Sequence, residues 1–259
     1  MGAGHAHPLH RPGTSPVHRL PAEVKVVAAV LGAVGVVATP REAFGVFAGH
    51  LLVLAAVWAV ARIPPGWILR RAVIELPFVV LAVLLPITGP GPRVDVWGVA
   101  LSEPGLLGAW NIVVKGTLGV LISLTLAATT PLRALLIGLQ RLRVPALVVT
   151  IATLMLRYAD LILAEAARMR RARLARGHDP RFLWQVGATA RGVGTLFVRT
   201  YERGERVHLA MLSRGFTGAL PGAADAVPTR REWLAGLAPA AVALALPALA
   251  VLGRSGAAG

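Results

Sequence analysis

Two short arginine-containing segments are the parts of this sequence whose residue types and spacing best fit a chemical role. They are Ala175-Arg176-Gly177 and Ser213-Arg214-Gly215, and they repeat the order small residue, arginine, glycine 38 positions apart. A guanidinium can form a forked pair of hydrogen bonds with a carboxylate. Each segment alone also fits an ordinary helix end, with glycine as the cap and arginine beside the negative end of the helix dipole. The repetition favours two equivalent contacts with a partner.

Histidines near the N-terminus are the candidates for a metal site. Neutral imidazole is a ligand for cobalt and nickel, whereas terminal segments are commonly disordered. We therefore predict no metal site. If this chain did bind a metal ion, His5, His7 and His10 would be the candidate ligands. The chain has no cysteine, which excludes disulfides and thiolate chemistry.

The sequence contains no glycine-rich phosphate-binding loop. The nearest glycine cluster, Arg191–Thr195, lacks the lysine and the spacing of such a loop. We therefore predict that this chain is not an enzyme and that any ATP hydrolysis takes place in partner subunits. Three ionisable residues lie within the apolar runs: His50, Glu75 and Lys115. We predict that they have structural roles and do not form a transport site, with Glu75 near the cytoplasmic side of the membrane and Lys115 near the outer side.

The composition is that of a membrane protein. Of the 259 residues, 56% are hydrophobic and only 15% are charged, against about 25% charged residues in a soluble domain. The net charge of +15 fits a membrane surface, an acidic partner or nucleic acid. Only 5% of the residues are aromatic, which argues against nucleic-acid binding.

Five apolar runs predict membrane-spanning helices. They lie near residues 24–39, 43–61, 72–88, 112–129 and 233–252. Basic residues gather before the first run, between the second and third, and after the fourth, so the positive-inside rule places these segments in the cytoplasm. The predicted order is a cytoplasmic tail at 1–23, four spans at 24–130, a cytoplasmic region at 131–218, a linker at 219–231, and a last span with a short tail at 232–259.

The cytoplasmic region is predicted to contain two long amphipathic helices. Apolar residues recur with helical period from Leu147 to Met169 and again from Leu183 to Met211. A helix of about 30 residues is about 45 Å long, enough to reach a partner. A pair of basic helices lying on anionic lipid would have the same composition, so composition leaves both interpretations open.

Several further strings, collinear over nearly the whole chain, resemble a known family. They are SPVHRL at Ser15–Leu20, SEPGL at Ser102–Leu106, AATTP at Ala127–Pro131 and YERGERV at Tyr201–Val207. Together with the two arginine segments they resemble the transmembrane T component of energy-coupling factor (ECF) transporters, in its cobalt branch, the CbiQ type.

The resemblance implies an all-α membrane bundle of about five spans in the cell inner membrane, with two cytoplasmic coupling helices. It implies the transmembrane coupling subunit of an ATP-driven importer, which passes motion of two ATP-binding cassette subunits to a substrate-binding membrane subunit. Cobalt would be the transported ion, and this chain would bind lipid but no cofactor and no nucleic acid. The residues expected to dock on the ATPases are Ala175, Arg176, Gly177, Ser213, Arg214 and Gly215.

Two alternatives stay open. One is a T component for nickel or a vitamin, because the coupling subunit would look much the same for any of these substrates. The other is a self-sufficient secondary transporter, which needs polar residues or broken helices converging near the middle of the membrane.

Overall fold

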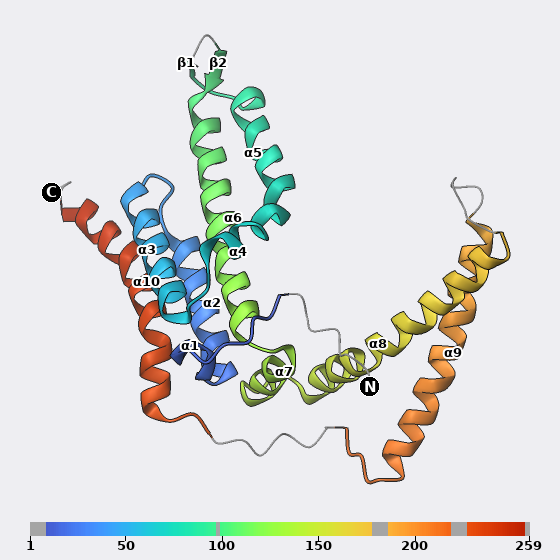
Figure 1. The fold of residues 1–259 in the computed structure, drawn as a ribbon. Coiled ribbons are helices and arrows are strands. Elements are labelled where there is room, and N and C mark those ends of the chain that lie inside the picture. The colour runs from blue at the N-terminus through green and yellow to red at the C-terminus, as the bar shows by residue number, and fades with distance from the viewer. Residues whose placement is uncertain (1–8, 97–98, 178–185, 219–226, 257–259) are drawn as a thin grey trace. The chain divides into compact units, whose positions relative to one another are not determined.

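The computed structural model describes residues 9–96, 99–177, 186–218 and 227–256 (Figure 1). These residues form helices joined by short connections, with one two-stranded hairpin. In chain order the elements are α1 (Pro16–Arg19), α2 (Ala22–Ala38), α3 (Phe44–Ala61), α4 (Pro65–Leu69), the 3-10 helix η1 (Ala72–Glu75), α5 (Leu76–Thr88), β1 (Arg93–Val96), β2 (Val99–Ser102), α6 (Glu103–Thr129), α7 (Leu132–Arg141), α8 (Ala146–Ala175), α9 (Gly187–Leu212) and α10 (Arg230–Gly256). The predicted all-α membrane class is confirmed.

The described residues separate into two compact units. Residues 9–138 and 227–256 form a helix bundle, and residues 139–177 and 186–218 form a second unit built on α8 and α9. We call these the bundle and the arm.

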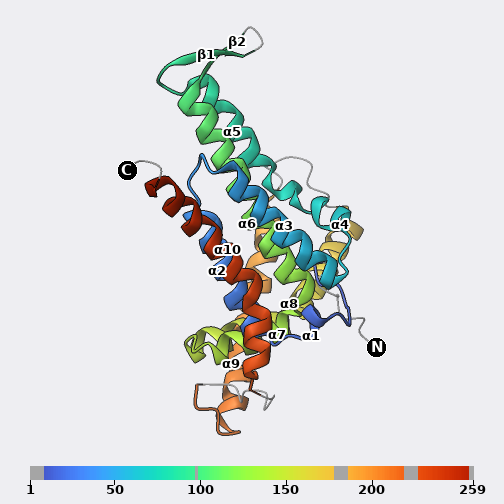
Figure 2. The ribbon, with the colours of Figure 1, turned by 90° about the vertical axis from the view of Figure 1, so that its left-hand side faces the viewer.

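The bundle is built on α2, α3, α6 and α10, which lie side by side in both views (Figures 1 and 2). Its core is apolar, with Phe47, Trp58 and Leu121 each at most 7% exposed. The indole Nε1 of Trp58 donates to Thr125 Oγ1 at 2.8 Å, which joins α3 to α6 inside this core. Buried polar groups need such partners because an unpaired one costs free energy in an apolar interior.

Small residues allow α2 and α10 to approach closely. A Cβ on Gly35 of α2 would lie only 2.5 Å from the carbonyl oxygen of Ala243 on α10. Membrane helices have no hydrophobic force between them, so they associate through close packing of such residues.

A helical pair, α5 and α6, is capped by the hairpin. The strands β1 and β2 pair antiparallel, with Arg93 opposite Ser102. The Ser102 hydroxyl donates to the Pro90 carbonyl at 2.9 Å and accepts from the Gly105 amide at 3.3 Å, so it caps α6. The SEPGL string of the sequence is therefore a helix start.

Four of the described helices are long and apolar enough to cross a membrane by length and composition: α3, α6, α8 and the Arg230–Ala250 part of α10. Three of them match predicted spans. The predicted first span forms α2, with 17 residues. The predicted third span is divided into η1 and the 13-residue α5, because Pro77 lacks an amide and sits in the first turn of a new helix. The fourth such helix, α8, was predicted to lie in the cytoplasm and not in the membrane. Length and composition do not decide between the two locations, and the count of five spans stays a prediction.

In the arm, α8 and α9 run antiparallel (Figure 1). They contain 30 and 26 residues, and at 1.5 Å per residue they are about 45 Å and about 39 Å long. The predicted start of the second helix at Leu183 lies outside the described residues, and α9 begins at Gly187.

Candidate docking site

The first arginine segment forms the C-terminal end of α8. The helix ends at Ala175, and the backbone amides of Arg176 and Gly177 donate to the carbonyls of Arg173 and Leu174 at 3.1 and 2.9 Å. Gly177 has φ of +76°, a left-handed conformation that residues with a Cβ rarely adopt. The glycine is therefore what allows the chain to turn directly after the arginine.

The second segment ends α9 in the same way. The helix ends at Leu212, and the Gly215 amide donates to the Leu212 carbonyl at 3.0 Å. The Phe216 amide donates to the Met211 carbonyl at 3.0 Å, which completes the hydrogen-bond pattern of a Schellman motif. Gly215 has φ of +80°. The glycine caps that the sequence allows at both helix ends are confirmed.

Both arginines are exposed, as are the small residues before them and the glycines after them. A Cβ at Gly177 or Gly215 would meet nothing within 4 Å. These glycines are therefore required by the backbone conformation and not by the packing of this chain. Because α8 and α9 run antiparallel, the two segments lie at opposite ends of the arm (Figure 1). Whether the six residues of the two segments dock on a partner stays a prediction.

An ion-pair cluster joins the two helices of the arm. Glu165 of α8 lies 3.3 Å from Arg199 and 3.5 Å from Arg203, both on α9. The Glu165 side chain is only 13% exposed, whereas those of Arg199 and Arg203 are 59% and 34% exposed. From sequence spacing alone, the nearest acidic partner for Arg199 would be Glu202, three residues further along the same helix. A long-range partner such as Glu165 leaves no signal in a single sequence, although Arg203 belongs to the YERGERV string.

Apolar side chains of the arm remain at its surface. Those more than 45% exposed on α8 include Leu147, Ile151 and Met155, and those on α9 include Val193, Phe197, Tyr201 and Leu209. Large exposed apolar surfaces are characteristic of sites that contact a partner or lipid.

The strings SPVHRL and AATTP are brought together in the bundle. The Lys25 ammonium donates to the carbonyls of His18 and Thr129 at 3.3 and 2.9 Å. The Arg11 amide donates to the Ala128 carbonyl at 3.0 Å. The N-terminal segment is thereby tied to the C-terminal end of α6, a contact that the sequence did not predict.

The structure describes only one of the three histidines considered for metal binding. His5 and His7 lie outside the described residues, and His10 precedes α1. Within the described ranges no group of three or more histidine, aspartate or glutamate side chains could hold a metal ion.

The three ionisable residues of the apolar runs all lie in the bundle. His50 is 2% exposed and its Nε2 lies 3.0 Å from Thr39 Oγ1. Glu75 and Lys115 both line a second cavity of about 600 Å³, and their opposite depths in the membrane stay a prediction. Lys115 donates to the Val37 carbonyl at 2.8 Å.

The helices and the paired arginine ends define an all-α polytopic membrane protein with a helical arm. The profile of the CbiQ cobalt transport protein family matches residues 13–223, and the chain belongs to this family. It is a cobalt-type transport component.

Three relatives illustrate the range of this similarity. The cobalt transport protein CbiQ of Rhodobacter capsulatus is 34% identical over 181 residues, which cover 67% of this chain and 71% of the relative. The energy-coupling factor transporter transmembrane protein EcfT of Acidaminococcus fermentans is 25% identical over 222 residues, covering 80% and 81% of the two chains. A putative fused cobalt transport protein CbiMQ of Methanocorpusculum labreanum is 25% identical over 216 residues, covering 80% of this chain and 36% of the fused protein.

Proposed function

We propose that this chain is the transmembrane coupling subunit of an ATP-driven ECF-type importer. Its arm docks on two ATP-binding cassette subunits, which hydrolyse the ATP, and passes their motion to a separate substrate-binding membrane subunit. The arm and the N-terminus face the cytoplasm, and the bundle lies in the cell inner membrane with five spans, in agreement with the distribution of basic residues.

One observation carries this proposal: the same helix-end geometry occurs twice. Arg176 and Arg214 are both exposed at the end of a long helix and are both followed by a left-handed glycine. Two equivalent ends suit two equivalent partner subunits, since each guanidinium can form a forked bond with a carboxylate. Removing one arginine should cost about 2–5 kcal/mol of docking free energy if its partner carboxylate is buried, and less than about 1 kcal/mol if it is exposed.

The arm is suited to transmit motion because its two helices are linked. Glu165 contacts two arginines of α9 that are four residues apart, Arg199 and Arg203. A force applied at either helix end therefore reaches the other helix through this cluster and through the helix backbones. Transmission by packed helices of this kind is a common mode of conformational change.

Co-purification with the ATP-binding cassette subunits tests the proposal. The double variant Arg176→Ala, Arg214→Ala should lose the ATPases, while a variant that removes two other exposed arginines of the arm, Arg170→Ala, Arg191→Ala, should retain them. The two variants have the same net charge. Equal loss from both would mean that the arm is a generic basic surface, and retention by both would reduce the segments to ordinary helix ends.

We propose cobalt as the transported ion on the basis of family membership. A T component for nickel or a vitamin remains the alternative, because substrate binding belongs to a different subunit. Uptake of radioactive cobalt by the complete transporter, competed with nickel, distinguishes the two ions. Competition by nickel at equal concentration that removes most cobalt uptake would contradict the assignment.

The second alternative, a self-sufficient secondary transporter, makes a separate prediction. Such a protein would move its substrate in vesicles that contain this chain alone, whereas a coupling subunit would move none without ATPases and ATP. Uptake by the chain alone would therefore overturn the proposed function.

A further inference from the structure

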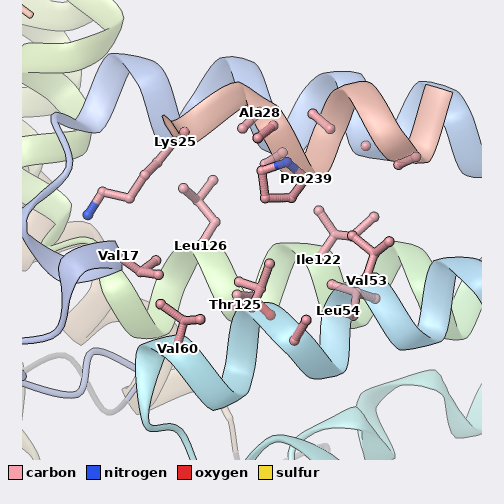
Figure 3. A pocket seen from close by; sticks show the side chains of 18 of the residues that line it. Val17, Lys25, Ala28, Val53, Leu54, Val60, Ile122, Thr125, Leu126 and Pro239 are labelled. Carbon is pink, nitrogen blue, oxygen red and sulfur yellow. The ribbon is translucent and has the colours of Figure 1, made fainter. Parts of the chain in front are cut away.

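A cavity of about 600 Å³ lies inside the bundle, between α2, α3, α6 and α10, with α1 at one end (Figure 3). Its walls are almost entirely apolar and include Ala28, Val53, Leu54, Ile122, Leu126 and Pro239. Two of the polar side chains in the wall already have partners within the bundle: the Thr125 hydroxyl pairs with the Trp58 indole and the Leu121 carbonyl, and His50 Nε2 lies 3.0 Å from Thr39 Oγ1. The walls therefore offer contacts for hydrocarbon and few for a polar solute.

The cavity reaches the surface of the bundle. Val60 and Val242 line it, and they are 51% and 49% exposed. Protein interiors are close-packed, and a void deprives its lining of dispersion contacts. Water does not compensate this loss, because a water molecule needs two to four polar partners. In a bilayer the available filling is hydrocarbon.

One end of the cavity carries positive charge. Figure 3 shows the Lys25 side chain extending its amine toward the end of the cavity where Val17 lies. Its ammonium donates to the carbonyls of His18 and Thr129, and an ammonium has three donors, so a third remains for a ligand. Arg19 is exposed on α1, whose Pro16 and Val17 also line the cavity.

We infer that this cavity binds one acyl chain of an anionic phospholipid, whose headgroup lies at Lys25 and Arg19. The apolar walls select hydrocarbon. The Lys25 ammonium in the cavity lining, with Arg19 exposed on the adjoining helix α1, selects a negatively charged headgroup by charge complementarity. An apolar segment of a partner protein would fit the walls equally but would carry no negative charge to pair with the basic residues. The bound lipid would fill the space between α2, α3 and α6 and would thereby stabilise the bundle.

Native mass spectrometry of the full chain, purified from nanodiscs that contain equal amounts of phosphatidylglycerol and phosphatidylcholine, tests the inference. The wild type should retain one phosphatidylglycerol molecule. Gly32→Leu extends a side chain from the cavity wall, where a Cβ meets only Ile122 at 3.7 Å, and should abolish retention. The control variant Val34→Leu also introduces a leucine into α2, at a half-exposed position, and it should retain the lipid.

The headgroup is tested by Arg19→Gln, which alters an exposed side chain and leaves the core intact. The preference for phosphatidylglycerol over phosphatidylcholine should fall about fivefold, since one basic residue near an anionic surface contributes about 1 kcal/mol. An unchanged preference would overturn the assignment of the headgroup. Absence of retained lipid from the wild type, or equal retention by Gly32→Leu and Val34→Leu, would overturn the site and assign the cavity to an apolar partner segment.

Discussion

The Glu165 carboxylate of α8 accepts a hydrogen bond from the Arg199 guanidinium of α9 at 3.3 Å. Glu165 is the less exposed of the two residues and also contacts Arg203. A largely buried carboxylate held by two cations from the opposite helix restricts the position of α9 against α8. The arm is thus held together by charge as well as by packing.

Replacing Glu165 with glutamine should loosen the arm. Exposed ion pairs contribute about 0–1 kcal/mol each, so Glu165→Gln should destabilise the contact by about 1 kcal/mol. Hydrogen exchange measured on the α9 amides near Arg199 should become about fivefold faster. The control is Glu202→Gln, the same charge change at an exposed position of α9. Equal acceleration in both variants would show that net charge, and not the Glu165 cluster, sets the stability.

The two left-handed glycines should be sensitive to alanine for backbone reasons alone. A left-handed conformation costs a residue with a Cβ about 1–2 kcal/mol, and neither Gly177 nor Gly215 has a neighbour within 4 Å of a new Cβ. Gly177→Ala and Gly215→Ala should therefore speed hydrogen exchange in the last turns of α8 and α9 severalfold. Gly204→Ala, inside α9 and also in open space, should slow exchange, since alanine is favoured over glycine in helices by about 1 kcal/mol. If all three variants respond alike, the helix ends do not depend on glycine.

Gly35 should be intolerant of any side chain. An added Cβ would contact the Ala243 carbonyl oxygen at 2.5 Å, so α2 and α10 would have to separate. Overpacking of this kind typically costs about 1–3 kcal/mol, and Gly35→Ala should lower the thermal unfolding temperature of the purified protein. Gly45→Ala, at a position with open space around it, is the matched control. A Gly35→Ala variant as stable as the control would contradict the close α2–α10 contact.

The N-terminal segment should loosen at acidic pH. Burial lowers the pKa of the His18 imidazole below its ordinary value of 6.5, helped by the charges of Lys25, His10 and Arg11 and opposed by the hydrogen bond to the Arg11 carbonyl. A lowered pKa favours the neutral ring in the folded state, so its stabilising contribution is complete above 6.5 and is lost as the pH falls below that value.

The Arg11 amide, which donates to Ala128, reports on this change. Its protection from hydrogen exchange, corrected for intrinsic rates, should stay constant above pH 6.5 and should fall as the pH is lowered from 6.5 toward about 5. In His18→Gln the protection should no longer depend on pH over that range. The same pH dependence in the variant would assign the effect to another group, such as His10.

Local rules account for the part of this molecule that could be predicted from sequence. Hydrophobic runs located α3 and α6, helical periodicity located α8, and the order of arginine and glycine predicted the helix ends at Gly177 and Gly215. Each of these features depends on residues within a few positions of one another. The membrane class follows from composition for the same reason.

Long-range contacts account for what the sequence could not reveal. Lys25 reaches Thr129 across 104 positions, and Arg199 pairs with Glu165 rather than with its near neighbour Glu202. The predicted third span is divided before α5 because of Pro77, which is a local cause. The apolar run continues through this proline, so hydrophobicity alone predicted one uninterrupted helix. A single sequence carries no record of which distant residues meet.

The most direct test of the central claim is site-directed crosslinking of the helix ends. Because the sequence contains no cysteine, a single introduced cysteine is the one site on this chain that a thiol reagent labels. A photoreactive maleimide attached to Ala175→Cys or Ser213→Cys should crosslink to the ATP-binding cassette subunits in membranes. The same reagent on Ala164→Cys, an exposed position within α8, should not. Crosslinks from both helix ends and none from the control are the predicted result. Crosslinks from neither end, or equal yields from Ala164→Cys, would contradict the claim that the two arginine segments dock on the ATPases.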